Sequence, residues 1–219
     1  MCEAALFDWD GTLADTRHAI VVSFHQALTE NGLDVSTEYV ERRIGIGASD
    51  TFREILRSKG LPVDEALVKR LVARKSEVQI ELAGEVRLFE GARELLAALQ
   101  GKVKVGLASM NSYSVVKHLL KINHLEKYFQ VVLTVDRVSR SKPDPEIFLK
   151  TAQELNARPD RCVVFEDSIF GVKAAKAAGM CCIAVTTGVY SGEELEKEKP
   201  DLVVKSLADP KIAAFVMEK

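Results

Sequence analysis

Long apolar runs and an excess of charge of one sign are both missing from this chain of 219 residues. No apolar stretch approaches the ~20 residues that a membrane-spanning helix needs. The formal net charge of −2 gives no electrostatic basis for binding nucleic acid or an anionic membrane surface. No basic segment precedes an apolar run at the N-terminus, so we expect no cleaved signal peptide and a cytoplasmic protein.

Cysteine is scarce, and its four positions do not form a metal-binding pattern. No Cys-x-x-Cys motif or paired histidine accompanies them. The cysteines are Cys2, Cys162, Cys181 and Cys182. The last three lie in apolar runs, which predicts buried, reduced thiols. A disulfide between Cys162 and either of the later two would be uncommon in a cytosolic protein.

The remaining composition, 47% apolar and 28% charged residues, is typical of a globular protein. Short apolar runs alternate with stretches of helical periodicity, which predicts an α/β fold: a Rossmann-like parallel sheet flanked by helices. The expected strands are residues 4–7, 103–108, 131–134, 162–165, 182–185 and 202–204. The expected helices of this sheet are residues 92–99, 114–122, 146–155 and 172–178.

One long interval, residues 17–84, lacks a convincing strand. Helical periodicity appears in it at residues 20–30, 50–56 and 64–82. We therefore predict an α/β core domain formed by residues 1–16 and 85–219, with a small α-helical cap domain of residues 17–84 inserted into it. Because the insert begins just after the first strand, we expect it to cover that edge of the sheet as a lid.

Two aspartates, Asp8 and Asp10, end the first apolar run in the sequence Phe-Asp-Trp-Asp-Gly-Thr. A buried strand that stops abruptly at this point would deliver both carboxylates to the edge where α/β sheets bind ligands. Gly11 allows a tight turn of the chain just past them. The two acids can then serve one site, one as a nucleophile and the other as a proton donor.

Polar residues also follow three later strands: Ser109, Lys142 and the pair Glu166 and Asp167. The carboxyl ends of parallel strands meet at one edge, so these groups should converge on the two aspartates. A cluster of acids would repel itself unless it held a cation. Oxygen ligands with room for water suit Mg²⁺, so we predict a magnesium cofactor here.

At these residues the chain resembles the haloacid dehalogenase superfamily, in the phosphatase branch with a helical cap. The resemblance covers nearly the whole chain, and phosphoglycolate phosphatases and β-phosphoglucomutase-like proteins are similar to it. Its four motifs match, in order, residues 7–12, 106–109, 141–146 and 165–171. Four motifs in the right order and spacing are far more specific than any one of them.

The resemblance implies a role for each group. Asp8 would attack phosphorus and form an aspartyl-phosphate, while Asp10 would protonate the leaving oxygen and later activate water. Metal ligands would be the Asp8 side chain, the Asp10 carbonyl and Asp167, with Glu166 as an orienting residue or outer ligand. The expected phosphate- and substrate-binding residues are Trp9 and Met110 through their main-chain N–H groups, with Ser109, Lys142 and Lys75 through their side chains.

Each residue also has a plainer interpretation. Asp10 could form a turn before Gly11, and Asp167 could cap the helix that follows it. Lys75 could lie on a solvated helix face beside Arg74; the alternative is that it reaches into the site. Four unrelated caps at four strand ends in motif order are improbable, so the catalytic interpretation is preferred.

Two alternative functions stay open: a sugar-phosphate mutase like β-phosphoglucomutase, and a non-catalytic binding protein on the same scaffold. The mutases carry an arginine and a histidine in the cap, where this chain has Ala48 and Ile20, which favours a phosphatase. The cap has few aromatic residues to stack a nucleobase. We expect a small phosphorylated metabolite, phosphoglycolate or a sugar phosphate, as substrate, no nucleic-acid or membrane partner, and a monomer or weak homodimer.

Overall fold

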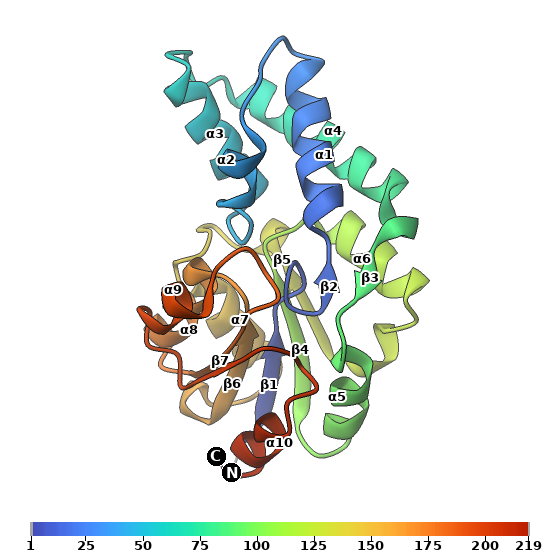
Figure 1. The fold of residues 1–219 in the computed structure, drawn as a ribbon, viewed down its shortest axis with the longest axis vertical. Helices are drawn as coiled ribbons and strands as arrows, with labels where there is room; N and C mark the ends of the chain where they lie inside the picture. The colour runs from blue at the N-terminus through green and yellow to red at the C-terminus, as the bar shows by residue number, and fades with distance from the viewer. Residues whose placement is uncertain (1, 219) are drawn as a thin grey trace.

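The computed structural model describes residues 2–218 and has a parallel six-stranded sheet at its centre (Figure 1). The strand order is β5-β4-β1-β6-β7-β8. The strands are β1 (Ala4–Phe7), β4 (Lys104–Ser109), β5 (Val131–Thr134), β6 (Cys162–Glu166), β7 (Cys181–Val185) and β8 (Leu202–Val204). The predicted α/β class, with its Rossmann-like parallel sheet, is confirmed, and all six expected strands form within one residue of the predicted limits.

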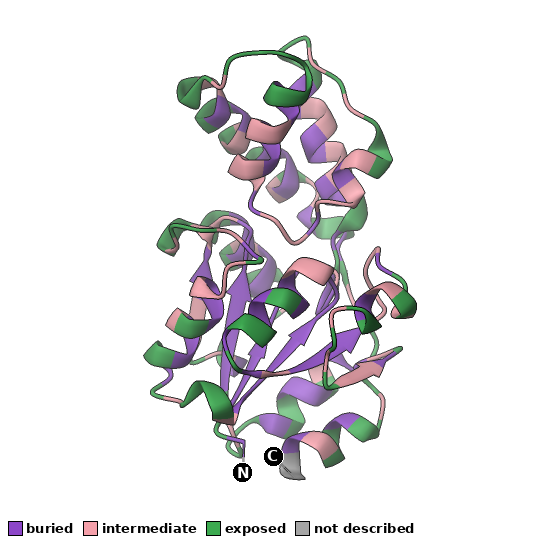
Figure 2. Cartoon of the chain, turned by 90° about the vertical axis from the view of Figure 1, so that its left-hand side faces the viewer, coloured by how far each residue is buried: buried purple, intermediate pink, exposed green. Residues whose placement is uncertain are grey.

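Helices cover both faces of the sheet because alternate strand residues are buried on opposite sides. Phe7 and Phe165 stack at 4.3 Å between ring centroids on the face covered by α5 (Ala92–Leu99), α6 (Tyr113–Ile122) and α10 (Lys211–Glu218). Leu6 and Val164 are buried on the other face, under α7 (Glu146–Glu154), α8 (Ile169–Ala177) and α9 (Gly192–Glu196). The central strands of the sheet are mostly purple in Figure 2, which marks them as buried, whereas the edge strands β5 and β8 are partly of intermediate exposure.

The register of the central strand decides which residues meet beyond it. Phe7 of β1 is paired with Leu107 on one side and with Phe165 on the other. The next residue along β1 is therefore flanked by the ends of β4 and β6. Asp8 lies there, at the carboxyl edge of the sheet, where open α/β folds bind their ligands.

Four helices form a separate layer above this edge (Figures 1 and 2). They are α1 (Arg17–Thr29), α2 (Thr37–Glu41), α3 (Ala48–Ser58) and α4 (Glu65–Glu81). We call residues 17–84 the insert. It has an apolar core of its own, in which Phe24 and Phe52 lie 4.7 Å apart between ring centroids. The division of the chain into domains at these limits stays a prediction.

The chain enters and leaves the insert through a short antiparallel ribbon, β2 (Ala14–Asp15) paired with β3 (Arg87–Leu88). The sequence did not predict these two-residue strands, because a pair so short has no hydrophobic period. Helices α2 and α10 were also missed. Short 3₁₀ turns complete the chain at Ala83–Glu85, Glu126–Tyr128, Val135–Arg137 and Pro159–Arg161. None of the described helices is both long enough and apolar enough to span a bilayer.

Candidate functional site

The two aspartates of the first motif lie in one tight turn after β1. Asp8 and Asp10 are both buried, and both line the same cleft between the sheet edge and the insert. Gly11 has a left-handed φ of 88°, which a residue with a side chain rarely adopts, and its N–H donates to the Ala14 carbonyl at 3.0 Å. The Trp9 side chain is fully buried in the core beneath the turn.

Lys142 bridges two carboxylates at the centre of the site. Its Nζ lies 2.6 Å from Asp8 Oδ1 and 2.5 Å from Glu166 Oε1, and it also donates to the Ala108 carbonyl at 3.3 Å. Burial works against the ammonium charge, but the attraction of Asp8 and Glu166 outweighs burial and raises the pKa of Lys142. The ammonium therefore stays charged, and it fixes the position of Asp8.

Glu166 is held by main-chain donors on its other oxygen. Its Oε2 accepts from the N–H groups of Asp167 and Ser168 and from the Ser168 hydroxyl, at 3.0–3.2 Å. Because Oε1 accepts from Lys142, Glu166 orients both Lys142 and the loop of residues 167–168. The Gly171 backbone packs so tightly on this carboxylate that a side chain there would overlap it.

Three acidic side chains, Asp8, Glu166 and Asp167, bring ligand oxygens within 4.8 Å of one another. All three are buried, and the ion pairs of the described residues give the group one cation, Lys142. Burial first, and then the neighbouring acids, raises the pKa of Asp167, and burial has the same effect on Asp8. With all three carboxylates ionised beside one ammonium, two negative charges would remain, and one divalent cation would neutralise them and favour the ionised forms. Hard oxygen donors of this kind fit Mg²⁺.

Asp167 is not the cap of the helix that follows it. The cap of α8 is Ser168, whose hydroxyl accepts from the Gly171 N–H at 3.0 Å. Asp167 Oδ1 instead accepts from the Thr12 hydroxyl at 2.9 Å, across the site. The plainer interpretation of Asp167 is thus wrong, and its carboxylate faces the acidic cluster.

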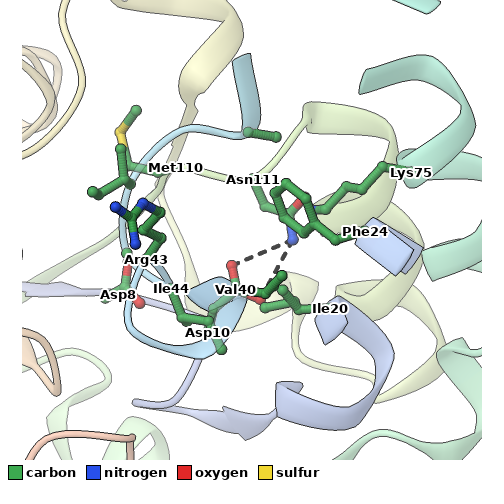
Figure 3. Close-up of a pocket in the computed structure, with 13 residues that line it drawn as sticks. Asp8, Asp10, Ile20, Phe24, Val40, Arg43, Ile44, Lys75, Met110 and Asn111 are labelled. Carbon is green, nitrogen blue, oxygen red and sulfur yellow. Dashed lines mark hydrogen bonds between the residues drawn. The ribbon is translucent and has the colours of Figure 1, made fainter. Parts of the chain in front are cut away.

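The end of β4 contributes polar groups around the second aspartate. Ser109 Oγ donates to Asp10 Oδ2 at 3.4 Å. Asn111 Nδ2 lies 3.3 Å from the same oxygen, and Figure 3 shows this contact. The Asn111 N–H donates to Ser109 Oγ at 3.1 Å, which fixes the turn between them. Met110 lines the cleft beside Asn111. The side chain of Asp10 thus bonds to groups at the end of β4. It is not the turn-forming side chain that the plainer interpretation expected.

Lys75 of α4 reaches down into the cleft from the insert. Its side chain is 4% exposed, hydrogen-bonds to Gln79, and donates to Asn111 Oδ1 at 3.2 Å. Burial lowers the pKa of Lys75 to about 8, with a small opposing effect from the Asp10 charge. Its neighbour Arg74 turns away and pairs with Glu30 at 2.9 Å. Of the two basic residues, only Lys75 faces the site.

The rest of the cleft wall is mostly apolar (Figure 3). The insert side of the cleft is formed by Ile20, Phe24, Val40, Arg43, Ile44, Gly45, Ile46 and Ala48. Arg43 is engaged by Glu54 at 2.8 Å and by the Tyr39 carbonyl at 3.2 Å. Gly45 and Ile46 belong to the glycine bend of residues 45–47 before α3, and both line the cleft.

Contacts between the insert and the core hold the cleft closed on one side. Tyr190 OH donates to the Arg42 carbonyl at 2.6 Å, and the Arg42 guanidinium pairs with Glu194 at 2.6 Å. The Ser141 hydroxyl donates to Asp50 of α3. Ser141 directly precedes Lys142, so one of these contacts touches the segment that carries the central ammonium.

A family model described as haloacid dehalogenase-like hydrolase matches residues 5–185. The chain belongs to this family. The haloacid dehalogenase-like match spans both the insert and the four strand ends that build the site.

Two curated relatives and one solved structure illustrate the relationship. A phosphorylated carbohydrates phosphatase of Thermotoga maritima is 36% identical over 81% of this chain and 82% of its own length. A probable phosphatase, IndB, of Dickeya dadantii is 31% identical over 98% and 94%. The crystal structure of a β-phosphoglucomutase from Clostridium difficile superposes with a TM-score of 0.88 at 27% identity, covering 100% of this chain and 96% of that one.

The residues singled out from the sequence meet in the structure. Six of them form one buried group: Asp8, Asp10, Ser109, Lys142, Glu166 and Asp167. Lys75 and Met110 line the adjoining cleft. Two cleft residues, Asn111 and Arg43, were missed. Asn111 comes two residues after Ser109 at a strand end, and Arg43 lies just before the glycine bend. These positions could have marked both as cleft residues, although their residue types alone could not.

Proposed function

We propose that this phosphatase of the haloacid dehalogenase-like family is a Mg²⁺-dependent phosphomonoesterase that acts through an aspartyl-phosphate on Asp8. The observation that carries the proposal is the buried Lys142 bridge between Asp8 and Glu166, beside Asp167. This arrangement holds one carboxylate oxygen in a fixed direction toward the cleft. It also leaves an excess of negative charge that suits a divalent cation.

In the first half of the reaction, an Asp8 oxygen attacks phosphorus and the bond to the leaving oxygen breaks. Asp10 gives its proton to that oxygen, held in place by the amide of Asn111 and the hydroxyl of Ser109. In the second half, Asp10 takes a proton from water, and the water oxygen attacks the aspartyl-phosphate. Phosphate leaves and the Asp8 carboxylate is restored.

The ion would be held by the Asp8 and Asp167 carboxylates and the Asp10 main-chain carbonyl, with Glu166 orienting its neighbours. When bound, Mg²⁺ neutralises the charge that develops on the phosphoryl oxygens. Lys142, which bonds Asp8 Oδ1, would contribute to the same neutralisation. Fixed charges of this kind supply most of the catalysis in phosphoryl transfer.

The proposed substrate is a small phosphorylated metabolite. The position of Lys75 favours a metabolite that carries a second anionic or hydroxyl group. The Lys75 ammonium is buried, and its hydrogen-bond partners are the neutral amides of Gln79 and Asn111. A carboxylate, phosphate or sugar hydroxyl at the far end of the substrate would complete its bonding. Phosphoglycolate and sugar phosphates both meet this requirement, and the few aromatic residues of the insert disfavour a stacked nucleobase.

A mutase is less well supported than a phosphatase, although a β-phosphoglucomutase shares the fold. A mutase must hold a sugar bisphosphate and keep water away from the aspartyl-phosphate. The positions where the mutases carry a cap arginine and histidine are Ala48 and Ile20, and both line this cleft as apolar side chains. A non-catalytic binding protein would have no need for the intact acid pair and Lys142.

The test is Mg²⁺-dependent release of phosphate from an aryl phosphate by the wild type and by Asp8→Asn. The change is nearly isosteric, so the variant should fold and lose at least a thousandfold in kcat. Turnover retained in Asp8→Asn would mean that Asp8 is not the nucleophile. A screen of phosphoglycolate, sugar phosphates and nucleotides follows, and a clear nucleotide preference would contradict the small-substrate proposal.

A further inference from the structure

The Asp167 carboxylate is packed between two glycines from distant parts of the chain. A Cβ placed on Gly11 or on Gly188 would lie 2.7 Å from Asp167 Cγ and closer still to Oδ2. Nonbonded atoms do not approach so closely, so the carboxylate can take its place only because both positions lack a side chain. Gly11 belongs to the first motif, whereas Gly188 lies in the segment after β7 and outside all four motifs.

The two glycines are needed for different reasons. Gly11 has a left-handed backbone, so its identity is explained by conformation alone. Gly188 has no positive φ. An alanine at 188 would fit the backbone, but the three atoms nearest its Cβ would all belong to Asp167, at 1.8–3.0 Å. The lack of a side chain at Gly188 is therefore a requirement set by the neighbouring carboxylate.

The segment that carries Gly188 also fixes the position of Gly11, on the opposite side of the Asp167 carboxylate. Thr187 Oγ1 donates to the Gly11 carbonyl at 2.6 Å, which ties the turn after Asp10 to the end of β7. Thr12, the residue after Gly11, donates to Asp167 Oδ1. The carboxylate thus has one oxygen fixed by a hydrogen bond and the other confined by two backbones.

We propose that Gly188 is a positioning residue that sets the orientation of the Asp167 carboxylate toward a bound divalent cation. The inference rests on the proposed function. A methyl group at 188 would turn the carboxylate away from the acidic cluster. Because the displaced atoms are the end of a side chain, the fold can absorb the change while the ion loses a well-placed ligand. Changes in residues that orient metal ligands typically weaken metal binding by about 10–100-fold.

The experiment measures Mn²⁺ binding to the substrate-free protein by calorimetry or by electron paramagnetic resonance of the free ion. Gly188→Ala should raise the dissociation constant at least about tenfold, within the range for such residues. Gly192→Ala is the matched control, because its Cβ would make an ordinary contact with Thr186 Cγ2 at 3.6 Å. It should bind Mn²⁺ as the wild type does. Equal affinity in Gly188→Ala and the wild type would overturn the inference.

A second measurement separates the inference from the proposed function and covers a variant that folds poorly. Thermal unfolding without metal is compared for Gly188→Ala, Asp167→Ala and the double variant. If the new methyl collides with Asp167, the Gly188→Ala change should cost little once Asp167 is truncated. An equal loss in both backgrounds would contradict the inference. Failure of the wild type to bind Mn²⁺ would refute the proposed metal site, whereas the unfolding comparison would still test the packing.

Discussion

The Lys75 ammonium lies 3.2 Å from Asn111 Oδ1, and the amide nitrogen of Asn111 lies 3.3 Å from Asp10 Oδ2. One asparagine therefore connects the only basic residue that α4 turns toward the cleft with the proposed general acid of the core. Closure of the insert and placement of the proton donor share this contact. Four expectations follow from this region and the adjoining acidic cluster, and each can be measured separately.

Replacing Lys75 by methionine should weaken the binding of substrates that carry a second anionic group. A hydrogen bond to a charged group contributes about 1.5–3 kcal/mol, which corresponds to a rise in KM of roughly 10–100-fold. An aryl phosphate without such a group should show little change in KM. Arg74→Met is the control, since Arg74 pairs with Glu30 outside the cleft. Equal effects on both substrate types would contradict the proposed contact.

The same substitution should stabilise the folded protein, although it weakens substrate binding. Burial lowers the pKa of Lys75 to about 8, against 10.5 for the free side chain. The folded protein therefore bears the cost of a buried charge below pH 8 and is relieved of it as pH rises toward 10.5. Lys75→Met should stabilise the fold at pH 7 by up to about 3 kcal/mol. Denaturant unfolding at pH 7 and pH 10 tests this, and a variant less stable than wild type at pH 7 would refute it.

Truncating Asn111 to alanine should lower kcat by roughly 10–100-fold, because Asp10 loses a donor that orients it. KM for an aryl phosphate should change much less than kcat. Asn123→Ala offers a comparison, since Asn123 bonds the Leu119 carbonyl at the end of α6, away from the cleft. A loss of similar size in both variants would indicate a general effect on the fold.

Removal of divalent metal should abolish turnover and also lower the melting temperature. Without an ion, burial and the neighbouring acids destabilise the charged carboxylates of Asp8 and Asp167 and raise the pKa of each. Mg²⁺ at 100 times its dissociation constant would add about 2.7 kcal/mol to the free energy of unfolding. Asp167→Asn should lose most of this increment. Full activity in the presence of EDTA, or the same Mg²⁺ increment in Asp167→Asn, would contradict the assigned ligands.

The sequence predicted the sheet and the catalytic edge because these depend on local patterns. Asp8 and Asp10 stop an apolar run, and a parallel sheet necessarily gathers such strand ends. The direction of Lys75 could not be derived in the same way. Adjacent helix residues point about 100° apart, and only the packing of α4 against α1 decides whether Arg74 or Lys75 faces the cleft. Asn111 and Gly188 could not be predicted for a related reason. Asn111 acts through Asp10 and Lys75, and Gly188 adjoins Asp167, so each depends on contacts with residues distant in sequence.

The ribbon of β2 and β3 has a consequence for how such an enzyme can change. Both crossings between core and insert pass through a single narrow neck, where Asp15 is paired with Arg87. Everything between these two residues can be exchanged without altering a strand end or a residue of the acidic cluster. The insert supplies Lys75 and the apolar wall, and the core supplies the acids. A different insert joined at this neck would present other side chains to the same acids. The reaction would then be kept while the choice of substrate changes.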